Sequence, residues 1–329
     1  MSKHSIRAVV LALLAMSVLG VGCSTVDSKK NDGTDSQEMK PIGYSEEKIS
    51  FENEETGIEL VGILFTPNGI DKSQEQVPGI IVTGPLTTVK EQAQSIYARR
   101  LAERGFVTMV FDHTYYGESG GAPRRLENPI MKDSDIKSAV SYLSSVPYVD
   151  SSRIGGVGIC GGGGQMTFTA SSDRRIKAVA GVVPYGIGVD KQLERLSGEE
   201  VAALEAQRDA YERGEAEPEY AGSYPAPYYL DPERGGIPEF DNIGTVTWST
   251  LYFGDYDLEA ALRQLAPTPL LIISPEQNLS PTAEVMNEIV TGTKEYHFIE
   301  GSNHFDHYDL EPYVTDNVQY IVNFFQQYL

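Results

Sequence analysis

Cysteine and basic residues are scarce in this chain of 329 residues. Its 26 lysines and arginines face 47 aspartates and glutamates, so the formal net charge is −21. Nucleic acid is therefore not an expected partner, because phosphates are bound by a basic face. The carboxylates show no cluster with the spacing of a metal ligand set, and we expect neither a metal nor another cofactor. Two cysteines allow one disulfide at most.

Residues 1–22 differ in composition from the rest of the chain. Two basic residues precede an apolar run over 8–19, and small residues then lead to Cys23. This order is typical of a secretory signal peptide. A cysteine at the junction resembles the lipobox of bacterial lipoproteins, in which the thiol is acylated. Because Gly20 stands where the lipobox prefers leucine, ordinary cleavage to a secreted soluble protein stays open.

We accordingly expect an exported protein that is held at the bacterial cell envelope by lipid on Cys23. Such an anchor makes the membrane a partner, because buried acyl chains hold the protein at its surface. Residues 23–45 are polar and lack periodicity, as in a flexible tether. Cys160 then has no intramolecular disulfide partner. An unpaired cysteine in an exported protein is either functional or a buried, inert residue.

Apolar stretches alternate with helical patterns over residues 46–329, and this length suffices for one large core. Two strands, 47–51 and 58–65, come first. Further strands are expected at 78–83, 106–111, 153–159, 176–183, 269–274 and 295–299, and helices at 90–104, 133–145, 165–171, 282–290 and 311–328. Continuous apolar strands separated by helices predict an α/β fold with a doubly wound, mostly parallel sheet.

Residues 186–256 interrupt this alternation. An acidic helical stretch over 196–214 is followed by a stretch rich in tyrosine and proline over 220–240. We expect an insertion that packs over the carboxyl edge of the sheet as a lid. Its tyrosines either line an aromatic substrate pocket or pack the lid with their hydroxyl groups in water. They are Tyr220, Tyr224, Tyr228 and Tyr229.

The sharpest motif is Gly158-Ile159-Cys160-Gly161-Gly162, between a predicted strand and a predicted helix. It has the form of the G-x-S-x-G nucleophile elbow, with cysteine in place of serine. The elbow is a strained turn with positive φ, so its neighbours must be small. It places Cys160 at a helix N-terminus, where the helix dipole favours thiolate. A dinucleotide-binding turn would need a well-placed G-x-G-x-x-G and a ribose-binding acid, which are missing.

Several further segments share the pattern of one family. They are Val89-Lys90-Glu91-Gln92, Phe111-Asp112-His113, Tyr116 to Gly121, Glu127-Asn128-Pro129, Arg153-Ile154-Gly155, Asp173 to Val179 and Gly301-Ser302-Asn303-His304. With the cysteine elbow, they make the chain resemble the bacterial α/β-hydrolases related to dienelactone hydrolases and to the X-Pro dipeptidyl-peptidase and polyketide-transferase-like group. The resemblance covers nearly all of residues 47–329 and implies an α/β-hydrolase fold.

The resemblance also implies a catalytic histidine in the turn after the last strand, where His304 stands. Its role would be general base toward the Cys160 thiol, or imidazolium partner of a thiolate. Three other histidines follow the signal segment. His297 lies within a strand, His113 lies in a segment that the family uses structurally, and His307 is one turn beyond His304 and could compete with it.

The third member of the triad departs from the family pattern. The family usually has an aspartate after the strand at 269–274, and here Asn278 takes that place. An asparagine can orient an imidazole by a hydrogen bond, but it cannot stabilise imidazolium by charge. Glu276 is the alternative acid. A carboxylate beside the insertion, Asp255 or Asp257, is a further alternative for the acid of the triad.

An oxyanion hole needs two backbone N–H groups, one of them from the residue after the nucleophile. That residue is Gly161. The second donor comes from the loop after the strand at 78–83, where the resemblance points to Leu86. Pro85 has no N–H to donate. Gly84 stands where the family often carries a histidine.

These observations predict a hydrolase of ester, lactone or thioester bonds in a small-molecule substrate, acting through an acyl-cysteine on Cys160. The same nucleophile could serve an acyltransferase or a peptidase, because a thioester is attacked readily by water or amines. The alternative is a ligand-binding lipoprotein that kept the fold without catalysis. Asn278 and the missing histidine at Gly84 motivate that alternative.

Overall fold

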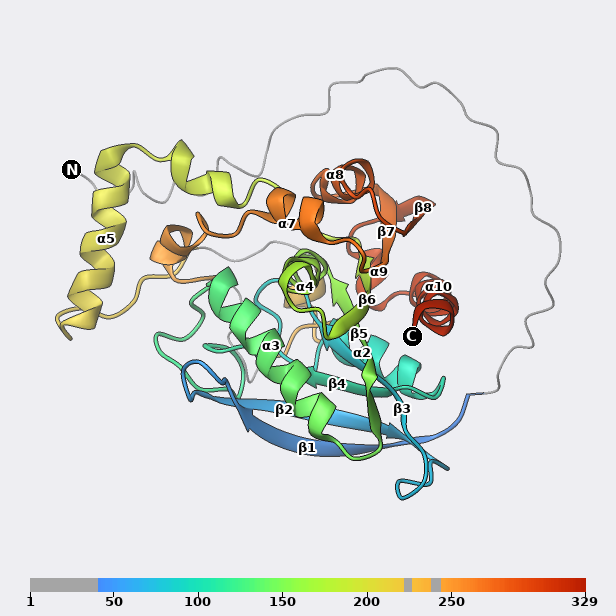
Figure 1. Ribbon diagram of the computed structural model, residues 1–329. Coiled ribbons are helices and arrows are strands. Elements are labelled where there is room, and N and C mark those ends of the chain that lie inside the picture. Colours follow the sequence, from blue (N-terminus) through green and yellow to red (C-terminus); the bar gives the residue numbers. More distant parts are fainter. Residues whose placement is uncertain (1–40, 222–226, 238–243) are drawn as a thin grey trace, which may run out of the picture. The chain divides into compact units, whose positions relative to one another are not determined.

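The computed structural model describes residues 41–221, 227–237 and 244–329 (Figure 1). The predicted signal peptide, the predicted lipidation site Cys23 and most of the predicted tether lie outside the described residues. Residues 42–329 form one compact unit. No helix in the part of the chain that the structure describes is both long enough and apolar enough to cross a lipid bilayer.

The described residues contain one eight-stranded sheet in the order β1-β2-β4-β3-β5-β6-β7-β8. Its strands are β1 (Tyr44–Glu52), β2 (Glu59–Pro67), β3 (Val77–Thr83), β4 (Val107–Phe111), β5 (Val149–Ile159), β6 (Ile176–Val182), β7 (Leu270–Gln277) and β8 (Lys294–Asn303). The pairs β1–β2 and β2–β4 are antiparallel, and all other neighbours are parallel. The mostly parallel sheet predicted from the apolar runs is confirmed.

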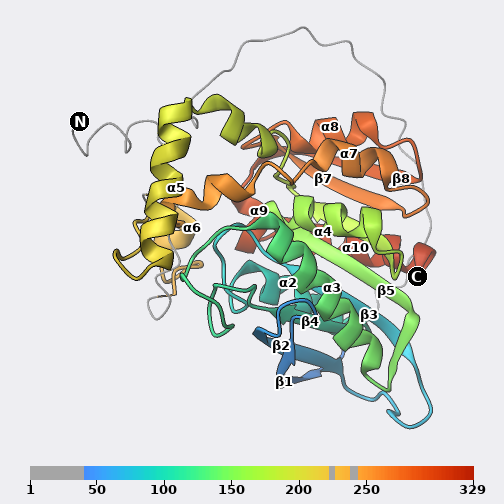
Figure 2. The ribbon, with the colours of Figure 1, turned by 60° about the vertical axis from the view of Figure 1, so that its left-hand side comes forward.

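Helices cover both faces of the sheet (Figures 1 and 2). One face carries α3 (Pro129–Ser145), α4 (Gly161–Ser172), α7 (Leu258–Gln264) and α8 (Thr282–Ile289), and the other carries α2 (Ala93–Ala102), α9 (Asp306–Asp309) and α10 (Tyr313–Tyr328). Successive side chains of a strand point to opposite faces. Ile81 accordingly packs in the first core, and Ile80 and Val82 pack in the second. Burial on both faces explains the continuous apolar runs.

Two helices begin earlier than the sequence predicts. α3 begins at Pro129, because the side chain of Asn128 accepts two backbone N–H groups of the first turn at 3.1 Å and proline suits that turn. α4 begins at Gly161 instead of Gln165, so the glycine-rich stretch forms its first turn. Cys160 therefore stands directly before a helix.

The insertion has a small apolar core of its own. Between β6 and α7 it forms two 3-10 helices, η2 (Asp190–Arg195) and η3 (Thr247–Tyr252), and the helices α5 (Gly198–Glu212) and α6 (Pro227–Leu230). Leu204 of α5 packs with Trp248 of η3 and with Leu126, which precedes α3. Farther along, residues 227–237 contact the loops that follow β3 and β8. The insertion thus supplies residues to the edge of the sheet where the strands end.

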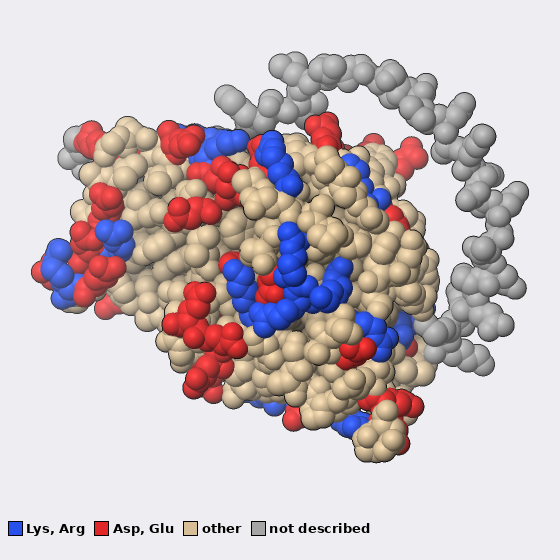
Figure 3. Space-filling view, in the orientation of Figure 1, with Lys and Arg blue, Asp and Glu red and all other residues tan. Residues whose placement is uncertain are grey.

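Charged side chains of both signs share the face that Figure 3 presents, and Lys and Arg gather near its centre. On α3 and at the end of α4, basic side chains are paired with acidic ones. Arg175 Nη2 lies 2.5 Å from Asp173 Oδ2, and Lys137 Nζ lies 2.7 Å from Asp133 Oδ2. The Arg175 side chain also donates to the Lys137 carbonyl at 3.1 Å. These basic groups therefore serve local pairing within the fold.

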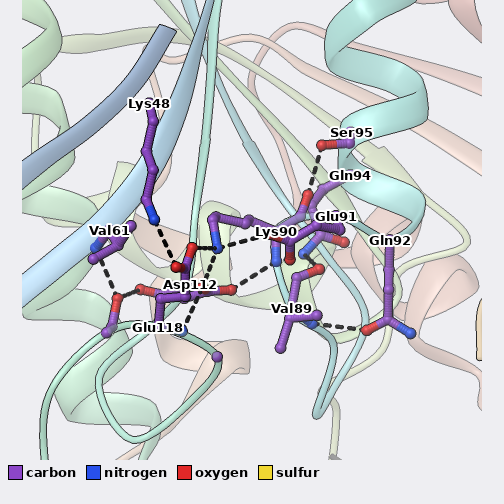
Figure 4. A network of polar contacts seen from close by, with 12 residues as sticks. Lys48, Val61, Val89, Lys90, Glu91, Gln92, Gln94, Ser95, Asp112 and Glu118 are labelled. Carbon is purple, nitrogen blue, oxygen red and sulfur yellow. Dashed lines mark hydrogen bonds and ion pairs between the residues drawn. The ribbon is translucent and has the colours of Figure 1, made fainter. Parts of the chain in front are cut away.

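A buried ion pair ties together the two loops that follow β3 and β4 (Figure 4). Lys90 Nζ lies 2.8 Å from Asp112 Oδ2 and 2.7 Å from Glu118 Oε2. Asp112 also accepts the backbone N–H groups of Lys90 at 2.7 Å and of Glu118 at 2.9 Å. Burial by itself would lower the pKa of Lys90, but the facing carboxylates outweigh it and the pKa is raised. Lys90 is therefore a fixed cation that sets the course of the β3 loop.

We predict that Asp112→Ala destabilises the fold by about 3–5 kcal/mol, because it leaves Lys90 and two backbone N–H groups buried without this acceptor. Urea unfolding measures the change. Lys48→Ala is the matched control, since Lys48 pairs with Glu118 at the surface and its loss should cost about 1 kcal/mol or less. Equal losses in the two variants would contradict a structural role for the buried pair.

Candidate active site

Cys160 lies in a sharp turn between β5 and α4, with φ of 53°. This positive φ is the strained conformation that the elbow motif predicts. A β-carbon at position 158 would lie 2.1 Å from the carbonyl oxygen of Gly162, so only glycine fits where the strand meets the helix. The Cys160 side chain is buried, with 5% of its surface exposed.

Three groups form hydrogen bonds with the Cys160 sulfur: the hydroxyl of Tyr308 and the backbone N–H groups of Gly161 and Leu86. Burial nevertheless raises the pKa of the thiol to about 11, although these hydrogen bonds act to lower it. The N–H of Gly161 at the helix N-terminus acts in the expected direction and favours thiolate, but burial is the larger effect. Desolvation outweighs the helix dipole, and Cys160 is a neutral thiol.

Gly161 and Leu86 are the two residues that the sequence analysis assigns to the oxyanion hole, and the structure brings them together. A β-carbon at position 161 would lie 3.3 Å from the backbone nitrogen of Leu86. Gln94 fills the space beside Gly84, because a β-carbon there would lie 2.0 Å from its Oε1. The Gln94 Nε2 donates to the Val89 carbonyl at 2.7 Å. A buried glutamine thus braces this loop.

His304 follows β8 directly, and its imidazole is oriented by Asn278, which follows β7. His304 Nδ1 lies 2.8 Å from Asn278 Oδ1. The same oxygen accepts the backbone N–H of Leu279 at 2.9 Å. Because this atom is an acceptor, Nδ1 must carry the proton, and Nε2 is left with its lone pair.

The Nε2 atom of His304 is buried and has no hydrogen-bond partner. Burial, with a smaller contribution from His307, lowers the pKa of His304 to about 3, so the imidazole is neutral. No hydrogen bond joins Nε2 to the Cys160 sulfur. The ring of Tyr308 packs edge-on against the His304 ring at a centroid distance of 5.7 Å, and its hydroxyl group is hydrogen-bonded to the Cys160 sulfur. An unpaired basic nitrogen is what a general base needs.

The remaining histidines are held in structural contacts. His307 Nε2 lies 2.9 Å from Ser302 Oγ, and Nδ1 lies 2.9 Å from Asn317 Nδ2, so neither nitrogen is available to compete with His304. His113 pairs with the buried Asp135 at 3.2 Å. His297 stacks on the ring of Tyr320 at a centroid distance of 4.1 Å.

The alternative acids lie in other contacts. Glu276 Oε2 accepts the backbone N–H of Gly301 at 2.7 Å, and no hydrogen bond joins this carboxylate to His304. Asp257 caps α7 by accepting the N–H of Ala260 at 2.9 Å. Asp255 has no hydrogen bond or ion pair with His304 either. Among the candidates, the structure brings only Asn278 to the imidazole.

Sequence reasoning missed Tyr308 and left Tyr229 outside the site. Tyr308 stands one helical turn after His304, which is the signal that could have placed it nearby. Tyr229 belongs to the tyrosines of the insertion, and its hydroxyl donates to the carbonyl of Leu86 at 3.2 Å. Tyr224 lies outside the described residues. The insertion therefore contacts Leu86, the predicted second oxyanion residue, directly.

Residues 62–211 match the model of the dienelactone hydrolase family. An uncharacterised protein YcjY of Escherichia coli K12 is 32% identical over 86% of this chain and 99% of its own. A second uncharacterised protein, PA2218 of Pseudomonas aeruginosa, is 31% identical over 99% of this chain and 96% of its own. The chain belongs to the dienelactone hydrolase family of α/β-hydrolases.

Solved structures agree with this assignment. The crystal structure of PA2218 covers 93% of this chain and all of its own, with a TM-score of 0.78 and 29% identity. The α/β-hydrolase GrgF of a Penicillium species covers 86% of this chain and 99% of its own, with a TM-score of 0.72. Its 20% identity shows the fold alone. The chain is thus an α/β-hydrolase, which argues against the ligand-binding alternative.

Within the described ranges, no group of three or more His, Cys, Asp or Glu side chains is arranged to hold a metal ion.

We predict that Asn278→Asp raises the pKa of His304, because a carboxylate beside Nδ1–H stabilises imidazolium. The imidazolium in turn favours the Cys160 thiolate and lowers the pKa of the thiol. Iodoacetamide should therefore alkylate Cys160 at neutral pH about tenfold faster for each unit by which the pKa of Cys160 falls. Peptide mass spectrometry at Cys160 follows the rate. Glu276→Gln is the control and should leave the rate unchanged. Acceleration by neither variant would contradict the role of Asn278, and an effect of Glu276→Gln alone would assign the role to Glu276.

Proposed function

We propose that this hydrolase cleaves ester, lactone or thioester bonds through an acyl-cysteine intermediate on Cys160. The observation that carries the proposal is the tautomer of His304, whose unpartnered Nε2 bears a lone pair within the site of a buried thiol. The N–H groups of Gly161 and Leu86, which face the sulfur in the resting site, are the donors for the oxyanion.

The reaction would have two halves. His304 Nε2 takes the thiol proton while the sulfur attacks the acyl carbonyl carbon, and the carbonyl oxygen becomes negative beside the two N–H groups. The bond from that carbon to the leaving oxygen or sulfur breaks, and the leaving group takes the proton from His304. Water then attacks the thioester and gives a proton to His304. The carbon–sulfur bond breaks, and Cys160 regains the proton.

The neutral state of both groups favours general-base catalysis over a preformed ion pair. Burial raises the pKa of Cys160 and lowers that of His304, and both shifts oppose charge separation. Asn278 supplies no negative charge that would reverse them. The proton therefore moves from sulfur to nitrogen during attack, and the pair stays neutral between turnovers.

Transfer to an acceptor other than water is the second candidate, and the enclosure of the site favours it. Cys160 and His304 are 5% and 1% exposed, so bulk water does not reach the thioester freely. A relative in Penicillium, 24% identical over 81% of this chain and 90% of its own, is named a polyketide transferase. In that case an alcohol or amine, in place of water, attacks the thioester of the same acyl-cysteine and takes up the acyl group.

The test is acylation by para-nitrophenyl acetate, followed by intact-mass and peptide mass spectrometry. We expect one acetyl group on Cys160, and Cys160→Ala should abolish both the adduct and turnover. His304→Ala should slow acylation by about 10²–10⁴-fold, the usual contribution of a positioned base. Added alcohols or amines that take up the acetyl group favour transfer, whereas release of acetate alone favours hydrolysis. Turnover by Cys160→Ala would contradict the acyl-cysteine mechanism.

We also propose that the protein is exported and held at a membrane by lipid on Cys23. The support is the sequence pattern at residues 1–23, which lies outside the described residues. Cells fed a labelled fatty acid should incorporate label into the wild-type protein and not into Cys23→Ala. Cys160→Ala is the matched control and should keep the label. Labelling that survives Cys23→Ala, or an unlabelled wild type in the culture medium, would contradict the anchor.

A further inference from the structure

The hydroxyl group of Tyr308 lies against the candidate nucleophile, and no role for it follows from the triad or from the oxyanion hole. It forms hydrogen bonds with the Cys160 sulfur and with the hydroxyl of Tyr229. Tyr308 is 1% exposed. A phenol buried next to a reacting atom is in a position to take part in the chemistry.

The ring of Tyr308 is fixed by aromatic neighbours on several sides. Its centroid lies 4.9 Å from that of Tyr228, 5.4 Å from that of Phe305 and 5.7 Å from that of the His304 imidazole. Edge-to-face contacts of this kind restrict the ring. The hydroxyl hydrogen, in contrast, can rotate about its C–O bond. The oxygen is therefore held at the sulfur while its proton can change direction.

The proton positions follow from the end of the chain of hydrogen bonds. The Tyr229 hydroxyl donates to the Leu86 carbonyl at 3.2 Å, so in the Tyr308–Tyr229 bond Tyr308 must be the donor. The oxygen of Tyr308 is then left to accept from the thiol of Cys160. In the resting site, the hydrogen bonds therefore run in one direction: the Cys160 thiol donates to Tyr308, Tyr308 donates to Tyr229, and Tyr229 donates to the Leu86 carbonyl.

We propose that Tyr308 is a further catalytic residue, whose hydroxyl turns to donate a hydrogen bond to the Cys160 sulfur whenever that sulfur becomes a thiolate. This inference rests on the proposed role of Cys160 as the nucleophile. In acylation the thiol proton goes to His304, and the Tyr308 O–H then points to the negative sulfur. In deacylation the carbon–sulfur bond breaks, and the same O–H binds the leaving thiolate before His304 returns the proton.

Tyr229 is the positioning residue of this arrangement. When Tyr308 turns toward the sulfur, the Tyr229 hydroxyl can turn from the Leu86 carbonyl and donate to the oxygen of Tyr308. Hydrogen bonds in such a chain polarise and strengthen one another. Tyr229 belongs to the insertion, so the insertion is connected to the Cys160 sulfur by two hydrogen bonds that share the Tyr308 hydroxyl.

The need for such a donor follows from the charges around the sulfur. Lys132 of α3 is a positive group that lowers the pKa of Cys160, and its contribution is smaller than those of the hydrogen bonds of Tyr308, Gly161 and Leu86. Tyr185 also interacts electrostatically with Cys160, and its phenol is neutral because burial raises its pKa. His304 is neutral as well. Hydrogen bonds are therefore the main stabilisation available to a thiolate here.

The test is the pH profile of Cys160 alkylation by iodoacetamide in the full-length protein, followed by peptide mass spectrometry. Tyr308→Phe should shift the profile to higher pH and slow alkylation at a fixed pH about tenfold, the effect of a shift of about one pH unit. Tyr228→Phe is the matched control. Its hydroxyl accepts the backbone N–H of Ala93 at 2.8 Å, away from the sulfur, so the profile should stay in place.

Replacement of Tyr308 by fluorotyrosine keeps the size of the residue and guards against a folding defect in Tyr308→Phe. A fluorinated phenol is a stronger donor, so the profile should shift to lower pH. An unchanged profile in both Tyr308 variants would overturn the inference, as would an equal shift in Tyr228→Phe. Because alkylation needs no substrate, these outcomes are independent of whether Cys160 forms an acyl-enzyme, which the acetylation experiment decides.

Discussion

Among the residues that the structure describes, no carboxylate is hydrogen-bonded to the buried Cys160 or His304, and the site depends on this constraint. A thiolate–imidazolium pair would need a negative group to stabilise the imidazolium, and Asn278 offers only the dipole of its amide. Burial acts in the same direction by penalising each charge. The stabilisation of charge must therefore come from hydrogen-bond donors already aimed at the atoms where charge appears.

Those donors are placed by the carboxyl edge of a parallel sheet. The turn after β5 supplies Gly161, and the loop after β3 supplies Leu86. The course of the second loop is set by polar contacts that are themselves buried, the ion pair of Lys90 with Asp112 and the side chain of Gln94. A loop built from flexible residues alone would not hold an N–H group in place, and preorganisation is what makes such donors effective.

The elbow and the fold could be predicted because backbone geometry dictates their residues. Positive φ at Cys160 and the close approach at Gly158 demand a particular run of glycines, and buried parallel strands demand continuous apolar runs. Asn278, in contrast, was indicated by the resemblance, because the family usually has an aspartate at that place after the strand at 269–274. The start of α4 was misplaced because four successive glycines resemble a turn, whereas here they form the first turn of the helix in close contact with the segments that follow β3 and β6.

The protonation states and Tyr308 could not be predicted, because both depend on contacts between distant segments. A motif shows a helix N-terminus beside Cys160, but only the folded protein shows that desolvation is the larger effect. The partners of the Tyr308 hydroxyl come from the turn before α4 and from the insertion, far away in sequence. Neither the spacing of residues nor their type indicates a contact between segments that are so distant in the sequence.

The position of Tyr229 has a consequence for how substrate choice and rate are connected in the proposed mechanism. Its hydroxyl contacts the carbonyl of Leu86, whose N–H is a proposed oxyanion donor, and also the hydroxyl of Tyr308, which contacts the proposed nucleophile. Any substrate group that displaces Tyr229 must alter both contacts at once. Specificity, which resides in the insertions of this fold, then acts on the stability of the thiolate and on the oxyanion hole together, and not only on binding.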